Sequence, residues 1–323
     1  MSSQDADLPD VSIIVVNYNT AHLLDELFRT LRAAKGTLRC QVIVVDNASR
    51  DDSVKILQTR HPGAELIVND VNVGFARANN QALPYARGRY ILLLNTDAFV
   101  SPDTLQKTIE FMDEHPRFGV LGVKLVGRDG SLQPSCRYFP TPWNVFVVSA
   151  GLKALFPKTH FVDNLSWDHA SVRECDWVPG CYYLVRREVI ARVGLFDPRY
   201  FLYYEEVDHC RAVRQAGWRV AYYPFTQVVH LGGESAVSMG PLAVRSRQLS
   251  ALQTESEMLY FRKQYGLAGV LSAFFLGLAS DIFVACKAIF RRLDMSRAAV
   301  AAKHALIVFK VLIVTRLASR ATR

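Results

Sequence analysis

"YILLLNTDAFV", residues 90–100, joins five apolar or aromatic side chains directly to Asn95, Thr96 and Asp97. A short uncharged run of this kind predicts a strand that is buried on both faces of a parallel sheet. In such sheets, ligands bind beyond the carboxyl ends of the strands. The stretch therefore predicts a rigid central strand whose polar tip lies over a ligand crevice.

Two earlier runs have the same form. "VSIIVVN" (11–17) leads into Asn17-Tyr18-Asn19, and "QVIVV" (41–45) leads into Asp46-Asn47. Segments with helical periodicity or caps alternate with these runs, which predicts βαβ units and an α/β fold whose polar strand tips converge. The predicted strands are 11–17, 41–49, 64–70 and 89–97. The predicted helices are 20–36, 49–63 and 74–88, with Thr20 as a cap and Pro84 as either an early end or a kink.

The pattern loosens after residue 100. We expect a helix from Ser101, as its cap, to 116 and a strand over 118–126, followed by irregular structure at 143–175. A strand and short helix follow in 176–194. The acids of "YFLYYEEVDHCRAVRQAGW" (200–218) stand at the front of a helix that ends at Gly217, and one or two strands over 219–233 reach His230.

The bulk composition limits the class of protein. A chain of 323 residues, half of them hydrophobic, accommodates one large α/β domain and an appendage. Six cysteines without a C-x-x-C pair indicate packing thiols in a reducing cytosol. Residues 1–10 are polar and acidic, so we expect them to be disordered and not to act as a secretory signal.

The positive charge is confined to the end of the chain. From Lys287 onward there are nine Lys/Arg and one acid, which accounts for the whole net charge of +8. Residues 267–280 carry no charge but are short for a membrane span, and Lys303 and Lys310 share a helical face. The extension 263–323 therefore favours an anionic membrane surface over nucleic acid, while a packed helix pair or a dimer contact remains the alternative.

Several polar residues are candidates for chemistry. Asp97, at a strand tip, is either a ligand for a divalent cation or a turn residue. The segment "YEEVDHC" (204–210) carries three acids, Glu205, Glu206 and Asp208. Either one of them acts as a general base, or all three only complement the dipole at the start of a helix. His230 becomes a metal ligand only if the fold brings it to Asp97.

The nucleotide-binding fingerprints are absent. The segment around Gly74 is neither G-x-G-x-x-G nor a P-loop, so the sequence predicts neither a dinucleotide site nor ATP hydrolysis. Arg77 is positioned to meet a phosphate, and Asp46 to bind a base or ribose, although helix-surface and capping roles explain both residues equally well.

Taken in order, "SIIVVNYNT", "VIVVDNASRDDS", "NVGFARANNQAL", "YILLLNTDAFVSPDTL", "GSLQPSCRYFPT", the segment "WVPGCYYLVRREVIARVGLFDPRYFLYYEEVDHCRAVRQAGWRVAYYP" and "VVHLGGES" resemble the inverting family 2 glycosyltransferases. Within that family the chain is similar to the rhamnosyltransferase-like branch of bacterial polysaccharide assembly. The resemblance covers residues 10–262. It implies a GT-A fold, a Rossmann-like mixed sheet flanked by helices, with a nucleotide-binding half at 11–100 and an acceptor half at 101–262.

The resemblance also implies roles for the candidate residues. Asp46 corresponds to the acid that contacts the nucleotide base. "NTD" stands where the family carries D-x-D, so Asn95 removes one anionic metal ligand and leaves Asp97, with His230 as an added ligand. Glu206 corresponds to the family's base, with Glu205 as the alternative and Asp208 completing the segment. The remaining residues expected around the nucleotide sugar are Asn17, Asn19, Asn47, Arg77, Asn79 and Thr96.

The expected activity is an inverting sugar transfer assisted by Mg²⁺ or Mn²⁺. The donor would be a dTDP- or UDP-linked sugar, with rhamnose as a candidate, and the acceptor a hydroxyl of a glycan or a polyprenyl-linked saccharide. The expected location is the cytoplasmic face of the bacterial cell membrane. Two alternatives stay open: a non-catalytic nucleotide-sugar-binding or scaffold protein, and a nucleotidyltransferase. A nucleotidyltransferase would require a Gly-rich basic loop after the first strand, which "NYNTAHLL" does not provide.

Overall fold

The computed structural model describes residues 8–163, 165, 167–232, 242–290 and 295–323, so residues 1–7 of the expected disordered terminus lie outside the description. The chain divides into two compact units, which we describe separately. The sheet unit comprises residues 1–137, 165–198 and 205–240. The helical unit comprises residues 138–164, 199–204 and 241–323.

The sheet unit is built on one mixed sheet. Among the described residues its strands follow the order β3-β2-β1-β4-β9-β6-β10-β5, with β7 beside β6 and β8 beside β10. Neighbours among β1 to β4 are parallel, as expected, whereas β9 lies antiparallel between β4 and β6. The strands are β1 (Val11–Asn17), β2 (Cys40–Asp46), β3 (Glu65–Val68), β4 (Tyr90–Asn95), β5 (Ala98–Val100), β6 (Phe118–Val126), β7 (Leu132–Gln133), β8 (Arg173–Cys175), β9 (Tyr182–Arg186) and β10 (Arg219–His230).

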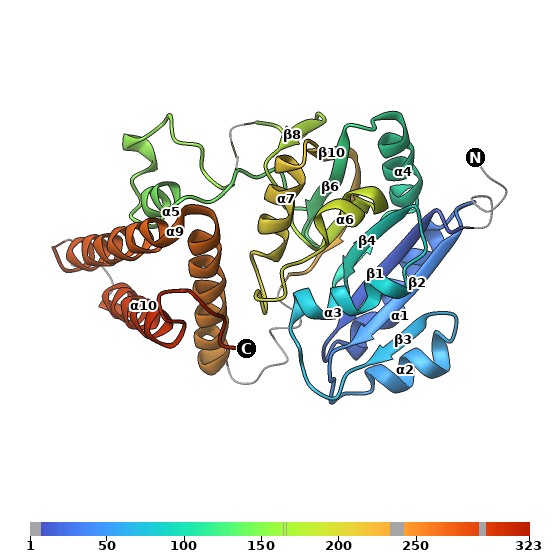
Figure 1. The fold of residues 1–323 in the computed structure, drawn as a ribbon, viewed down its shortest axis with the longest axis horizontal. Coiled ribbons are helices and arrows are strands. Elements are labelled where there is room, and N and C mark those ends of the chain that lie inside the picture. Colours follow the sequence, from blue (N-terminus) through green and yellow to red (C-terminus); the bar gives the residue numbers. More distant parts are fainter. Residues whose placement is uncertain (1–7, 164, 166, 233–241, 291–294) are drawn as a thin grey trace. The chain divides into compact units, whose positions relative to one another are not determined.

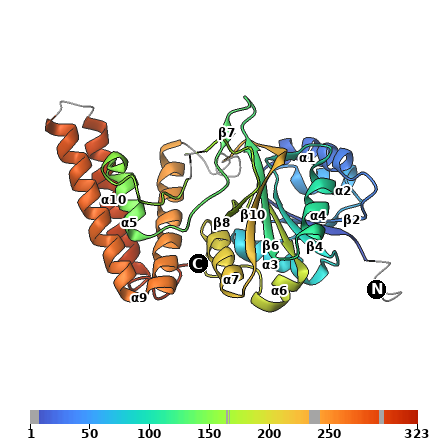
Figure 2. The ribbon, with the colours of Figure 1, turned by 90° about the horizontal axis from the view of Figure 1, so that it is seen from above.

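Helices cover both faces of this sheet. Figure 2 shows α1 and α2 on one side and α3, α6 and α7 on the other. This follows from right-handed crossovers, because the chain moves outward from β1 to β3 and then reverses direction to reach β4. The helices of the sheet unit are α1 (Ala21–Ala34), α2 (Ser53–Arg60), α3 (Phe75–Ala82), α4 (Thr104–Glu114), α6 (Arg187–Val193) and α7 (Glu205–Gln215), with a 3₁₀ turn at Leu83–Tyr85.

Alternation along the strands explains the core. Val11, Ile13 and Val15 point to the face where α1 packs Leu24 and Leu27, and all five side chains are almost fully buried. β1 and β4 are buried along nearly their whole length, as the uncharged runs predicted. This burial makes the strand tips rigid supports for the polar residues that follow them.

Some local predictions are confirmed by the structure and others are not. α3 does stop at Ala82, before the Pro84 turn. Ser101 is not the cap of α4, because the helix begins at Thr104 and the Ser101 hydroxyl instead donates to the carbonyl of Gln227 at 2.9 Å. The stretch 143–175 is not wholly irregular, since it contains β8 and most of helix α5.

The helical unit contains α5 (Pro142–Ser149), a 3₁₀ turn at Lys153–Leu155, α9 (Leu242–Phe290) and α10 (Met295–Val314). α5 begins with a capping box in which Thr141 and Asn144 satisfy each other's backbone N–H groups. α9 is two helices joined at Gly266, whose φ of 67° breaks the helical path (Figure 1). The extension predicted at 263–323 lies within the last segment of this unit, residues 241–323.

One apolar segment stands out in the helical unit. Among the described residues, Ala251–Lys287 is long and apolar enough to cross a membrane, with a mean hydropathy of 2.0 in its best window. Only 22% of that window is buried inside the protein, and the break at Gly266 interrupts the segment. The uninterrupted apolar helix is therefore residues 267–290.

Candidate active site

The tips of β1, β2 and β4 meet as the sequence analysis predicted. Asn17 pairs with Asp46 in the ladder, and its Nδ2 donates to the Asp46 carboxylate at 2.7 Å. Thr20 occupies the N-cap position of α1 but does not cap it with its side chain. Its hydroxyl instead bonds Asn17 Oδ1 at 2.7 Å and the Thr96 hydroxyl at 2.9 Å, which ties the tip of β1 to the tip of β4.

Loops on both sides are anchored to these tips. The Asp46 carboxylate accepts the backbone N–H of Ser49 at 2.9 Å, and Asn19 Oδ1 accepts that of Arg50 at 2.6 Å. Asn47 Oδ1 accepts the N–H of Val73 at 3.0 Å, which holds the loop before α3. Asp46 and Asn47 are nearly inaccessible to solvent, so this corner is a preformed polar cradle.

Asp97 and His230 are far apart in the sequence but lie close together in the structure. β5 pairs antiparallel with β10, and the register sets His230 opposite Ala98. The His230 Nε2 lies 3.6 Å from Asp97 Oδ1, and the Gly232 N–H donates to Asp97 Oδ2 at 3.1 Å. His230 Nδ1 bonds Gln133 Oε1 at 2.9 Å, which leaves Nε2 directed at the carboxylate.

These residues form a sparse donor set for a divalent cation. Burial lowers the pKa of the His230 imidazole, helped by the Arg137 guanidinium and opposed by Asp97, so the ring is favoured in the neutral form that metal binding requires. Asn95 Oδ1 is buried without a hydrogen-bond partner. Within the described ranges no group of three or more His, Cys, Asp or Glu is placed to hold a metal. One carboxylate, one imidazole and one amide oxygen fit a cation whose remaining ligands come from a diphosphate.

The three acids at the start of α7 differ in their surroundings. Glu205 is 4% exposed, and burial, followed by the neighbouring Glu206, raises the pKa of its carboxyl well above the ordinary value. Burial also raises the pKa of Glu206, but nearby backbone N–H groups and the Arg137 guanidinium oppose the shift. Asp208, three residues after Glu205, is buried as well. The Oε2 atoms of both Glu205 and Glu206 are buried without a hydrogen-bond partner, so the two carboxylates differ in their electrostatic surroundings and not in this feature.

Residues 180 and 181 connect the surroundings of Glu206 with those of Asn95. The Asn95 N–H donates to the carbonyl of Cys181 at 3.1 Å. A methyl group built on the preceding Gly180 would lie 3.9 Å from the Glu206 Cβ and 3.7 Å from the Phe75 ring. Glu206 thus lies beside Gly180, close to the start of α3, and Gly180 directly precedes Cys181, which contacts the tip of β4.

Arg137 is a residue that the sequence analysis missed. Its guanidinium lies 4.8 Å from the centre of the Trp177 ring, and its Nε donates to the carbonyl of Pro134 at 3.1 Å. Its positive charge lowers the pKa of the His230 imidazole and opposes the rise in the pKa of Glu206, so its field acts on both residues. The only available signal was its place in "GSLQPSCRYFPT", a segment without periodicity.

Two of the expected nucleotide-sugar residues have other partners. The Arg77 Nε donates to the carbonyl of Pro198 at 3.0 Å, which ties α3 to the loop after α6. Asn79 is buried and bonds the Phe75 carbonyl of its own helix at 2.9 Å. Their contacts with a nucleotide sugar stay a prediction.

Comparison with known proteins gives this geometry a context. The sequence profile described as "Glycosyl transferase family 2" matches residues 12–163. Rhamnosyltransferase WbbL of Escherichia coli is 30% identical over 234 residues, covering 68% of this chain and 83% of WbbL. An N-acetylglucosaminyl-diphospho-decaprenol L-rhamnosyltransferase of Mycobacterium tuberculosis is 27% identical over 237 residues, covering 68% of this chain and 75% of the relative.

Two solved structures share the fold. Residues 1–349 of S. aureus TarS superpose with a TM-score of 0.51 at 18% identity, over 95% of this chain and 91% of TarS. The mannosyltransferase PcManGT from Pyrobaculum calidifontis, solved with GDP-Man and Mn²⁺, gives 0.52 at 19% identity, over 97% and 84% of the two chains. With WbbL matched over most of its length and the GT-A architecture in place, the chain belongs to glycosyltransferase family 2.

Proposed function

We propose that this glycosyltransferase transfers a hexose, with rhamnose as the leading candidate, from a dTDP- or UDP-linked donor to a polyprenyl-linked saccharide. The donor class is suggested by the polar cradle around Asp46 and Asn17, whose hydrogen-bonding groups suit a pyrimidine base and its ribose. The acceptor class is suggested by the mycobacterial relative, whose name specifies a decaprenol-linked N-acetylglucosamine. In this scheme residues 11–100 bind the nucleotide and 101–262 the acceptor.

The observation that carries the mechanism is the position of Glu206 beside Gly180 and Phe75, together with an Oε2 that is buried without a hydrogen-bond partner. An acceptor hydroxyl has a high pKa and must lose its proton as it attacks the anomeric carbon. Glu206 accepts that proton, and its raised pKa makes it a stronger base than an exposed glutamate. Attack from the face opposite the leaving diphosphate inverts the anomeric centre without a covalent sugar–enzyme intermediate.

The leaving group requires positive charge. A Mg²⁺ or Mn²⁺ held by Asp97 and His230, with Asn95 as a neutral ligand, would neutralise the diphosphate when bound. Arg137 supplies a second, permanent positive charge in the same site. Its stacking on Trp177 fixes the guanidinium plane, which suits a phosphate better than a mobile ammonium would.

The helical unit is proposed to lie on the cytoplasmic face of the cell membrane. Its exposed apolar residues include Phe275, Leu306 and Phe309, each more than half exposed, and Lys303 and Lys310 are exposed on α10. Exposed apolar groups beside lysines suit the interface of an anionic leaflet. This placement gives access to a lipid-linked acceptor.

The test is a screen of the purified protein against dTDP- and UDP-sugars with Mg²⁺ or Mn²⁺ and polyprenyl-diphospho-N-acetylglucosamine. We expect nucleoside diphosphate release and a new glycolipid with one donor, and loss of both with EDTA. Donor binding without turnover of any sugar would instead support a non-catalytic nucleotide-sugar-binding protein.

A further inference from the structure

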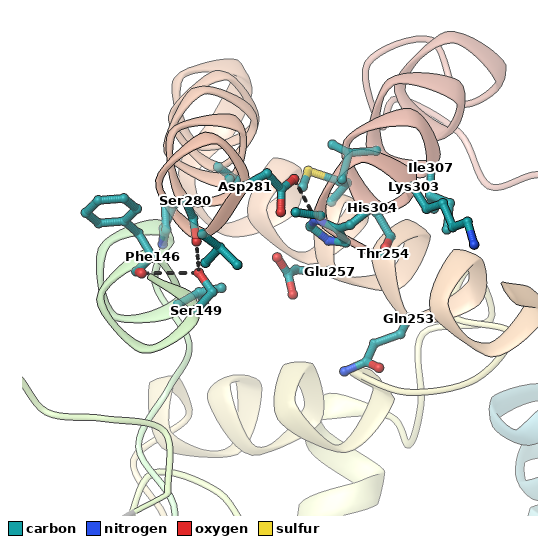
Figure 3. Close-up of a pocket in the computed structure, with 18 of the residues that line it drawn as sticks. Phe146, Ser149, Gln253, Thr254, Glu257, Ser280, Asp281, Lys303, His304 and Ile307 are labelled. Carbon is teal, nitrogen blue, oxygen red and sulfur yellow. Dashed lines mark hydrogen bonds and ion pairs between the residues drawn. The ribbon is translucent and has the colours of Figure 1, made fainter. Parts of the chain in front are cut away.

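The helical unit contains an open cavity that the sugar-transfer chemistry does not use. It has a volume of about 820 Å³ and lies among α5, both halves of α9, and α10 (Figure 3). Its size falls within the range of roughly 300–1,000 Å³ that is typical of ligand pockets. We propose that this cavity binds part of the hydrocarbon chain of the polyprenyl-linked acceptor, an inference that rests on the proposed function.

Small residues create this space. Ala273, Gly277 and Ser280 recur at helical spacing on the side of α9 that faces the cavity, and Ala301 faces them from α10. A Cβ atom built on Gly277 would meet no heavy atom within 4 Å. Larger residues at these positions would let the helices pack without a void, so the volume results from the sequence itself.

The wall is suited to hydrocarbon. Pro142, Phe146, Met258, Phe261 and Val308 are among the apolar residues that line it, contributed by all the surrounding helices. A flexible hydrocarbon chain gains from burial in such a space in proportion to the apolar area it removes from water.

Several polar groups of the wall already have hydrogen-bond partners in the protein. His304 Nδ1 lies 2.9 Å from Asp281 Oδ2, and the Ser280 hydroxyl donates to that of Ser149 at 2.9 Å, as the dashed lines in Figure 3 show. The Glu257 carboxylate accepts the Tyr204 hydroxyl at 2.8 Å, and burial raises the pKa of Glu257. Because these groups are satisfied by other groups of the protein, they do not require a polar ligand, and the apolar side chains of the wall suit a hydrocarbon chain.

The cavity also has a route to lipid. Leu267, Leu271, Phe275, Leu278 and Ile282 recur every three or four residues on one face of α9, and each is between 37% and 61% exposed. On α10, Val300 lines the cavity although it is 64% exposed, so it stands at an opening to the surface. A hydrocarbon chain that starts in a bilayer beneath these faces enters the cavity without crossing water.

The inference is tested with the full chain in detergent micelles and tritium-labelled undecaprenyl phosphate as the probe. Gly277→Leu places an apolar side chain in the cavity and improves helix propensity, so the variant is expected to fold. Ala279→Leu adds the same side chain two residues away at an exposed position and is the matched control. We expect at least tenfold weaker binding of the probe to Gly277→Leu, no more than a twofold change for Ala279→Leu, and unchanged circular dichroism for both.

A second measurement separates this site from the transferase assignment. With an active donor, Gly277→Leu should raise KM for a polyprenyl-linked acceptor at least tenfold, while KM for a short alkyl-linked acceptor and kcat stay the same. Wild-type protein that binds the probe but transfers no sugar would contradict the proposed function and still support the chain site. Unaltered binding to Gly277→Leu, or equal competition by dioleoyl phosphatidylglycerol, would overturn the chain site.

Discussion

The two units of this protein depart from the usual distribution of residues in opposite ways. In the sheet unit, polar side chains such as Asn17, Thr20 and Asp46 are fully buried and held by hydrogen bonds to one another. In the helical unit, large apolar side chains such as Phe275 and Leu306 are more than half exposed. Buried polar and exposed apolar groups are the informative exceptions in a folded protein. The contrast is the basis of our proposal that the first unit carries the chemistry and the second contacts lipid.

The sharpest test of the first assignment is Glu206→Gln. Removing the base should lower kcat by about 10²–10⁴-fold, because the amide cannot accept the acceptor proton. The affinity for the nucleotide sugar, measured by calorimetry, should stay within twofold. Glu188→Gln, which changes an exposed acid on α6, is the control and should be silent. Wild-type turnover in Glu206→Gln would end the base assignment.

The next largest effect concerns the cation. Asp97→Asn should reduce turnover on the order of 100-fold, as when one stabiliser of developing charge is removed. Asn95→Asp restores an acid to the strand tip and should lower the Mn²⁺ concentration for half-maximal activity about tenfold, equivalent to ~1.4 kcal/mol. Metal titrations of the two variants check this pair. An Asn95→Asp titration curve that coincides with the wild-type curve would argue against a cation at this tip.

Variants of Arg137 test whether the surroundings of Glu206 and those of His230 act together in one site. Arg137→Ala should lower kcat/KM about tenfold or more, and Arg137→Lys should recover only part of it, because an ammonium cannot stack or bind two oxygens at once. Arg173→Ala is the control, since Arg173 also stacks on a tryptophan, 3.9 Å from the Trp167 ring. Equal losses in the two alanine variants would indicate that Arg137 acts only on folding.

The helical unit is tested by charge. Lys303→Gln combined with Lys310→Gln should weaken binding to phosphatidylglycerol vesicles about tenfold or more, because each lysine near an anionic surface contributes ~1 kcal/mol. The difference should shrink at 0.5 M salt, as screening predicts. Lys55→Gln in α2 is the control. Vesicle binding that changes neither with the two substitutions nor with salt would favour a packed helix pair or a dimer contact over a membrane.

The smallest effect distinguishes the two neighbouring glutamates by stability. The folded state raises the pKa of Glu205, so its carboxylate costs free energy once the pH rises through that value. Glu205→Gln should therefore increase the unfolding free energy at pH 8 by about 1 kcal/mol, and the gain should vanish at pH 4, where Glu205 is protonated. Urea unfolding at the two pH values measures it. A gain that grows toward acid would contradict the sign.

The polar strand tips could be predicted because they depend on local sequence. A buried run ending in Asn17, Asp46 or Asn95 sets both the strand and the residue at its carboxyl end, and parallel pairing brings those ends together. The pairing of Asp97 with His230 needed the β5–β10 ladder, which joins residues 128 to 132 positions apart. Arg137 could not be found from periodicity, because its place depends on the contact with Trp177 and not on a helix or strand.

The sequence by itself determined the alternating α/β half, the family resemblance and the apolar basic extension. Periodicity predicts the first, the order of motifs the second and composition the third, and all three are local properties of the chain. Only the tertiary structure decided that Thr20 links two strands instead of capping a helix, that Glu206 faces Gly180, and that Ala273, Gly277 and Ala301 leave a cavity. These features depend on which side chains meet across distant segments, and neither propensity nor local pattern specifies that.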